Sequence, residues 1–447
     1  MIKKNHILPL LIGIVMAFSQ QLSAQTETVA METSPADSLS LDSIISRVVS
    51  SYPSVKEAEE AIKRADTQIE LARSGHYPNV SANASYSHIG PVTKFSIPGM
   101  GEIQMNPSDN YSATIDVSQS ISDFGKTAAN IAFQQESKQL GKQTLEQVKQ
   151  QLSIRAVHTY YSLLFLQEAI DIKNEQLANL QRHLDFINKK METGSATQYE
   201  ALSTKVKISG VKSQKLDILA SIRIQQAVLN TLLGEPETKR HFVKEKLTVD
   251  HPQHLVADTM INMAVRNRDE MKIAREKTRL AELNLNLIKS KNTPNLRAFV
   301  SAGAKDGYIP SLYQLKPNYA VGLDLHIPIF DANRNKNQQL LAKSGIQSSV
   351  YETERMQREV ASDVIKSSAN VETAAHKVQQ FKLQLKQARD AFSLAETSFK
   401  AGSITNLDLL DATTAVSNSR LLLLKSEIDY ALSIYDLQAS IGDRMYE

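Results

Sequence analysis

The sequence has no cysteine, and beyond its first residues it has no long apolar segment. With no cysteine among 447 residues, it can form neither a disulfide nor a lipid-carrying cysteine at a processed N-terminus. After the first 24 residues no stretch approaches the ~18 apolar residues that a membrane-spanning helix needs. The longest run of leucines, at 421–424, is followed by Lys425. No membrane helix is therefore expected in the body of the chain.

Charge and short motifs exclude further classes. The formal net charge is +3, which gives no sign of a nucleic-acid-binding protein. The motifs G-x-x-x-x-G-K-[ST], H-E-x-x-H and G-x-S-x-G are absent. His251 and His254 stand close together in a polar segment, where histidines are more often solvated than metal ligands. We therefore expect no catalytic residue, no cofactor and no metal site.

The first 25 residues, MIKKNHILPLLIGIVMAFSQQLSAQ, have the three parts of a secretory signal: a basic end, an apolar run and a small-residue cleavage site. Residues 1–24 are predicted to be a signal peptide cleaved after Ala24, which would leave a net charge of +1. The alternative is a membrane anchor, but the apolar run is short and polar chain follows it. Residues 25–40 are polar and are predicted to form a flexible lead-in.

The chain contains an internal duplication. NYSATIDVSQSISDFGK at 110–126 and NYAVGLDLHIPIFDANR at 318–334 share five identities, each 208 positions apart. The same offset relates Gly194-Ser195 to Gly402-Ser403, whereas Pro78 and Pro294 differ by 216, so the second copy is eight residues shorter between these points. The predicted organisation is a first repeat at 41–234, a connection at 235–257, a second repeat at 258–442 and a tail at 443–447.

Each repeat has two segments in which apolar and polar residues alternate, typical of strands with one wet face. The predicted strands are about 79–89, 110–122, 295–304 and 318–330. The polar face includes Asp116 and Asp324, with Phe299 as an exception. One interpretation is a half-buried sheet. The other is a transmembrane barrel, in which both aspartates would face the lumen. Four strands cannot close a barrel, so several chains would have to share it; three would give twelve strands and a water-filled lumen.

Very long helices follow the strands. Residues 126–192 and 333–400 contain no proline and one glycine each, and roughly 65 residues at 1.5 Å per residue make a rod of about 100 Å. Apolar residues step by three and four along them, as in antiparallel helical hairpins: Leu177, Leu180, Leu184, Ile187 and Met191. Apolar residues off this seam indicate a second contact face. A cylinder of helices needs both faces, whereas a solvated two-helix coiled coil needs only one.

Both hairpins turn at a glycine-led segment, GSATQYEALSTKV at 194–206 and GSITNLDLLDATT at 402–414. In each, a threonine precedes an acid by three residues, the pattern of a helix capping box: Thr197 with Glu200, and Thr405 with Asp408. Asp411 lies a turn too deep to cap, and Ser203 holds its place in the first copy. The i, i+3 spacing puts Asp408 and Asp411 on one helix face. Asp408 can therefore be a cap, a functional acid or both.

Together these features resemble the TolC family of outer-membrane efflux proteins. The resemblance rests on the duplication, the paired strands, ISDFGKTAANIA and IPIFDANRNKN where strands pass into helices, and GSITNLDLLDATT. It implies a mainly α fold with membrane β: a homotrimer whose twelve-stranded barrel lies in outer-membrane lipid and whose α-helical barrel crosses the periplasm of a Gram-negative bacterium. It also implies a periplasmic adaptor (a membrane fusion protein) and an inner-membrane transporter of RND, ABC or MFS type.

The resemblance also assigns residues. Gly194, Ser195, Gly402 and Ser403 would be the hairpin tips at which the adaptor docks. Asp408 and Asp411 match the family's paired aspartate rings at the periplasmic constriction. Family members with a well-described closed state hold their hairpins with a tyrosine and an arginine against an acid. Those positions are Phe399, Ile404 and Glu200 here, so that polar contact is absent.

The expected function is a passive exit duct for small molecules. An alternative within the same architecture is the outer-membrane duct of a type I protein secretion system. An alternative of another class is a soluble periplasmic coiled-coil scaffold. The exported substrate does not follow from the sequence, because in such systems the inner-membrane pump selects it.

Overall fold

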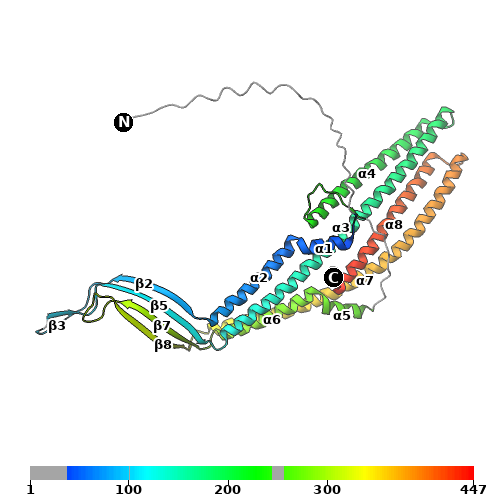
Figure 1. The fold of residues 1–447 in the computed structure, drawn as a ribbon. Coiled ribbons are helices and arrows are strands. Elements are labelled where there is room, and N and C mark those ends of the chain that lie inside the picture. The colour runs from blue at the N-terminus through cyan, green and yellow to red at the C-terminus, as the bar shows by residue number, and fades with distance from the viewer. Residues whose placement is uncertain (1–37, 100, 244–255, 447) are drawn as a thin grey trace, which may run out of the picture. The chain divides into compact units, whose positions relative to one another are not determined.

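The computed structural model describes residues 38–99, 101–243 and 256–446, which form long helices and a four-stranded sheet (Figure 1). The predicted signal peptide, its cleavage site after Ala24 and most of the predicted lead-in lie outside these residues. The elements are β1 Ser38–Leu39, α1 Leu41–Ser51, α2 Pro53–Arg73, β2 Asn79–His88, β3 Lys94–Ile97, β4 Gly101–Gln104, β5 Asp109–Ser122, α3 Lys126–Glu192, α4 Gln198–Leu233, β6 Phe242–Val243, α5 Ala257–Asn267, α6 Asp269–Ser290, β7 Asn295–Lys305, β8 Lys316–His326, α7 Arg334–Lys400 and α8 Asn406–Ile441.

The duplication seen in the sequence recurs in the helices. Helices α3 and α7 both have 67 residues, and α4 and α8 both have 36. The break between α1 and α2 falls at Tyr52 (φ −65°, ψ 137°), and that between α5 and α6 falls at Arg268 (φ −61°, ψ 135°). These two breaks lie 216 positions apart, the offset already noted between Pro78 and Pro294.

The four long strands form one antiparallel sheet in the order β2-β5-β7-β8. Asp116 faces Ser301 across the sheet and Asp324 faces Arg297, so both aspartates belong to one polar face. Asp116 accepts hydrogen bonds from Asn83 and Thr114. Strands β2 and β8 are the edges, with one partner strand each within the described chain.

Two strand predictions need correction. The fourth strand was expected at 318–330, but β8 runs from Lys316 to His326. Residues 327–330 lie beyond it, where Pro328 has no N–H to donate to a ladder. The segment between the first two predicted strands, for which no strand was predicted, contains the hairpin β3–β4, in which Lys94 pairs with Gln104 and Ile97 with Gly101.

The lead-in predicted for 25–40 extends too far. Ser38 and Leu39 pair in parallel with Phe242 and Val243. The Ser40 side chain then accepts a hydrogen bond from Ser43 N at 3.3 Å and caps α1. Leu39 packs against the largest core cluster, which anchors residues 38–40 to the helices.

An aspartate that recurs in both repeats closes each strand-to-helix junction. Asp123 accepts from Thr127 N at 2.7 Å, and Asp331 accepts from Asn335 N at 2.8 Å. The turn itself places Phe124 (φ 52°) and Ala332 (φ 54°) in the left-handed region, which residues with a Cβ rarely adopt. The aspartates therefore satisfy helix-start N–H groups and hold a strained turn in both copies.

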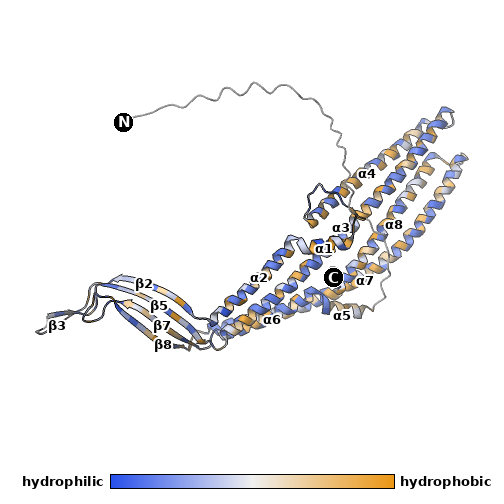
Figure 2. Cartoon of the chain, in the orientation of Figure 1, coloured by the Kyte–Doolittle hydropathy of each residue, from blue (hydrophilic) through white to orange (hydrophobic). Residues whose placement is uncertain are grey.

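The helical core lies where α1, α3, α4 and α8 meet. Its centre contains side chains with no exposed surface: Ile44, Val48, Tyr160, Leu163 and Leu229. A second cluster lies toward the α3–α4 and α7–α8 turns and includes the predicted seam residues Leu180, Leu184 and Ile187. Apolar and polar residues are interspersed along both hairpins (Figure 2). In the described ranges, no helix has the length and hydropathy needed to cross a membrane.

A buried carboxyl joins α3 to α6. Glu136 is only 8% exposed, and Arg279 of α6 lies 3.2 Å from its Oε2. Burial, together with the neighbouring Glu276 carboxyl, raises the pKa of Glu136 from 4.5 to about 7, and Arg279 offsets this only in part. The folded protein therefore holds a proton at Glu136 more tightly than the unfolded chain does.

This gives a pH prediction with a definite sign. The stability that comes from protonated Glu136 is present below its ordinary pKa of 4.5 and is lost as the pH rises through about 7. The thermal midpoint should therefore fall between about pH 5 and about pH 8. Glu136→Gln should flatten that fall, whereas Glu282→Gln, an exposed change on α6, should not. Circular dichroism of the detergent-purified protein measures this, and an equal slope in Glu136→Gln would contradict it.

Candidate functional site at the hairpin turns

The two hairpins turn through the same backbone conformation. Gly194 has φ 71° and Gly402 has φ 74°, the left-handed region that favours glycine. In the first turn Ser195 N donates to Lys190 O at 2.8 Å, and in the second Ser403 N donates to Ser398 O at 2.9 Å. These bonds satisfy carbonyls at the ends of α3 and α7. The glycine-serine pairs singled out in the sequence therefore form equivalent turns.

Both capping boxes are present. The Thr197 hydroxyl accepts from Glu200 N at 3.3 Å while Glu200 accepts from Thr197 N at 2.6 Å. The same two bonds join Thr405 and Asp408, at 3.3 and 2.9 Å. Hydrogen bonds from the Thr405 hydroxyl and then from the Thr405 backbone hold the pKa of Asp408 below its ordinary value. Its contribution to the start of α8 is therefore present above the ordinary carboxyl pKa and is lost as the pH falls through the lowered one.

Asp411 does not cap, but it has a partner that the sequence analysis missed. Lys207 Nζ, from α4, lies 3.2 Å from Asp411 Oδ1. The Asp411 side chain is 64% exposed, so the pair lies at the surface and its two charges offset each other locally. No sequence pattern links residues on two different hairpins, and only the packing of α4 against α8 reveals this pair.

Asn406 connects the two hairpins. It is the first residue of α8 and is only 4% exposed. Its amide nitrogen donates to Glu200 O, Ser203 Oγ and Thr204 Oγ1 at 3.2, 3.2 and 3.3 Å. Its Oδ1 accepts a hydrogen bond from His183 Nε2 at 2.6 Å, so the proton of this imidazole lies on Nε2. One side chain thus ties α8 to α3 and α4.

Apolar packing occupies the positions of the absent tyrosine and arginine. Phe399 is 6% exposed, with the His183 and Phe186 rings 5.4 and 6.3 Å away. The Lys190 ammonium lies 5.1 Å from the Phe186 ring and 5.2 Å from the Phe399 ring. Ile404 packs against the same cluster. The hairpins are therefore joined by aromatic packing, by Asn406 and by the pair Lys207–Asp411.

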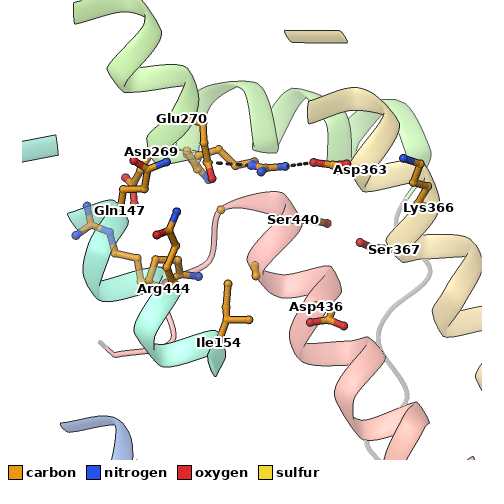
Figure 3. A pocket seen from close by; sticks show the side chains of 16 residues that line it. Gln147, Ile154, Asp269, Glu270, Asp363, Lys366, Ser367, Asp436, Ser440 and Arg444 are labelled. Carbon is orange, nitrogen blue, oxygen red and sulfur yellow. Dashed lines mark hydrogen bonds and ion pairs between the residues drawn. The ribbon is translucent and has the colours of Figure 1, made fainter. Parts of the chain in front are cut away.

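A polar cavity of about 290 Å³ lies between the start of α6 and the helices α3, α7 and α8 (Figure 3). Arg268 donates from Nε to Glu270 and from Nη1 to Asp363, at 3.2 Å each. These bonds link the α5–α6 break to α7, a structural role. Within the described residues, no three His, Cys, Asp or Glu side chains are grouped so as to hold a metal ion.

The comparisons with known proteins agree with this architecture. The model of the family described as outer membrane efflux protein matches residues 44–235 and 260–443. The chain belongs to this family. It is 21% identical over 454 residues to outer membrane protein TolC of Escherichia coli (strain K12), covering 98% of this chain and 86% of that protein. It is 22% identical over 330 residues to alkaline protease secretion protein AprF of Pseudomonas aeruginosa, covering 72% and 67%.

Solved structures share the fold. The outer membrane protein VceC of Vibrio cholerae superposes with a TM-score of 0.75 at 16% identity, covering 91% of this chain and 97% of that one. The open state of the MtrE channel of Neisseria gonorrhoeae gives 0.73 at 18%, covering 90% and 89%. The TolC-like fold expected from the sequence is thereby confirmed. The protein is an outer-membrane channel of the Gram-negative cell envelope, with its helical part in the periplasm, and it is not an enzyme.

The buried position of Asn406 gives a prediction. Asn406→Ala should remove the link between α8 and the other hairpin and leave His183 without its partner, at a cost of about 1–3 kcal/mol in local opening free energy. Hydrogen exchange of the first turns of α4 and α8 measures this. Gln198→Ala is the matched control, because Gln198 holds the equivalent place in α4 and is exposed. Equal exchange in the two variants would contradict the role assigned to Asn406.

Proposed function

We propose that the protein is the trimeric exit duct of a tripartite efflux system, which exports small molecules through the outer membrane. The observation that carries the trimer is the pair of open edges, β2 and β8, on a sheet of four strands. Unpaired backbone groups are not tolerated in lipid, so β8 of one chain would pair with β2 of the next. Three chains then close twelve strands around a polar face that includes Asp116 and Asp324.

We propose that the periplasmic adaptor, a membrane fusion protein, docks at the tips formed by Gly194-Ser195 and Gly402-Ser403. Next to each tip an apolar side chain is exposed at the second position of the following helix: Tyr199, 72% exposed, and Leu407, 50% exposed. Apolar groups repeated at equivalent exposed positions suit a partner that contacts both tips alike. The adaptor would connect the duct to an inner-membrane transporter of RND, ABC or MFS type.

Export of small molecules is favoured over protein secretion by the names of two relatives. One is the pyoverdine export outer membrane protein OpmQ of Pseudomonas putida, and another is the cobalt-zinc-cadmium resistance protein CzcC of Cupriavidus metallidurans. AprF, named for alkaline protease secretion, supports type I secretion as the second candidate. Crosslinking in cells followed by identification of the inner-membrane partner separates the two.

We further propose that Asp408 and Asp411 line the periplasmic constriction. In a trimer they supply six carboxylates, which attract cations and repel one another. Lys207 beside Asp411 reduces the field of three of these six. The net negative charge at the constriction is therefore smaller than six aspartates alone would give.

The tips can be tested separately from assembly. Gly194→Val with Gly402→Val forces β-branched residues into left-handed conformations and should abolish export by distorting the docking turns. Native mass spectrometry should still find three chains, because the sheet is unchanged. Gly210→Ala is the control, since a Cβ there meets nothing within 4 Å. Export that survives the double change would place docking elsewhere, and a stable monomer that inserts in bilayers would refute the shared barrel.

The constriction can be tested with multivalent cations in planar bilayers. Asp408→Ala with Asp411→Ala should remove block by a trivalent cobalt complex added at the periplasmic side and weaken cation selectivity. Lys207→Gln should have the opposite effect and strengthen the block, because it frees Asp411. Thr405→Ala, which weakens the cap but keeps both acids, is the control. Unchanged block in the double variant would mean that these acids only finish a helix.

A further inference from the structure

Two lysines face each other at the loop end of the sheet. Lys305, the last residue of β7, and Lys316, the first of β8, are direct register partners. Strand alternation puts both on the polar face, with Arg297 and Asp324 at the opposite end of the same two strands. Arg297 and Asp324 face each other with charges of opposite sign. Lys305 and Lys316 face each other with charges of the same sign, an arrangement that destabilises a strand pair.

The nearby carboxylates are engaged elsewhere. Asp306 is 7% exposed, and its Oδ1 accepts from Tyr111 N at 3.0 Å on β5. Asp109 accepts from Tyr86 at 3.0 Å and lies 2.9 Å from His88 Nδ1. Glu102 pairs with Lys94 at 3.4 Å on the β3–β4 hairpin. Among the described residues, neither Lys305 nor Lys316 forms an ion pair with an acid.

In a trimer, the strand of the next chain that pairs with β8 would not supply a negative charge to Lys305 or Lys316. The edge strand β2, NVSANASYSH, contains no acid. Within the described residues, the aromatic ring near Lys305 is that of Tyr308, which lies 5.4 Å from Lys305 Nζ and does not neutralise the ammonium's charge. A closed ring of three chains therefore gathers six uncompensated ammonium groups around the loop end of the lumen.

We propose that Lys305 and Lys316 form an anion-binding ring at the outer mouth of the duct, which takes solutes bearing phosphate or carboxylate groups. The inference rests on the proposed trimeric duct. Ammonium groups bind such oxygens through charge-assisted hydrogen bonds, and rings of cations select anions in pores. The outer mouth then has the opposite charge to the acidic periplasmic mouth. Anions outside the cell are retained at the exit, and cations outside are repelled from it.

The test uses the full-length protein in planar bilayers of zwitterionic lipid, with tripolyphosphate added to each side in turn. Tripolyphosphate is expected to block the current when it is added at the outer mouth, whereas multivalent cations block it from the periplasmic side. Lys305→Gln with Lys316→Gln should raise the concentration for half-block about tenfold, and high salt should do the same in the unaltered protein. Lys305→Arg with Lys316→Arg should keep the block. Lys94→Gln, which removes a lysine from the outer hairpin, is the matched control and should change little.

Two results would overturn the proposal: equal block in the Gln double variant, or an equal loss in Lys94→Gln, which would indicate a general surface charge. Calorimetric titration of detergent-purified protein with tripolyphosphate gives an independent reading. It should show binding that the Gln double variant loses, and no binding to the unaltered protein would also refute the ring. Failure of the duct appears differently, as a lack of any open-channel current in every variant.

Discussion

Backbone groups that must find hydrogen-bond partners constrain the rest of this chain. Within the described chain, the sheet of four strands leaves one edge of β2 and one edge of β8 unpaired, and unpaired edges are not tolerated in lipid. A single copy therefore cannot be the functional unit of an outer-membrane channel. The same requirement acts at each junction below the sheet, where Asp123 and Asp331 satisfy the first N–H groups of the long helices. The aspartates therefore stabilise the starts of α3 and α7 at these positions.

At the other end of the helices, contacts between the hairpins replace the polar contact expected of the family. Asn406 is buried, and both the oxygen and the nitrogen of its side-chain amide form hydrogen bonds. Lys207 and Asp411 are at the surface. A buried hydrogen-bonded amide leaves unsatisfied partners when it separates, whereas a surface ion pair exchanges easily with water. The two contacts therefore differ: the hydrogen bonds of Asn406 are costly to break, and Lys207 offsets part of the charge of Asp411.

Much of this fold could be predicted from the sequence because its signals are local or repeated. The alternation in the strands and the threonine-acid pairs at 197–200 and 405–408 depend on neighbouring residues, and the 208-residue offset is visible because such local patterns occur twice. The missed features depend on residues distant in sequence. Lys207 meets Asp411, and Asn406 meets His183, only after two hairpins pack together. Leu39 lies in a strand because β6, more than 200 residues later, pairs with it.

The equal lengths of the paired helices have a consequence for how such a chain can evolve. Removing one residue from α3 alone would shorten it by about 1.5 Å and rotate everything beyond by about 100°. The turn between α3 and α4 would then be displaced along the helix axis from the turn between α7 and α8. Asn406 would no longer contact α4. Length changes are therefore tolerable only when they occur in both copies together. The segments that join β2 to β5 and β7 to β8 carry no such coupling, and the eight-residue difference between the copies lies there.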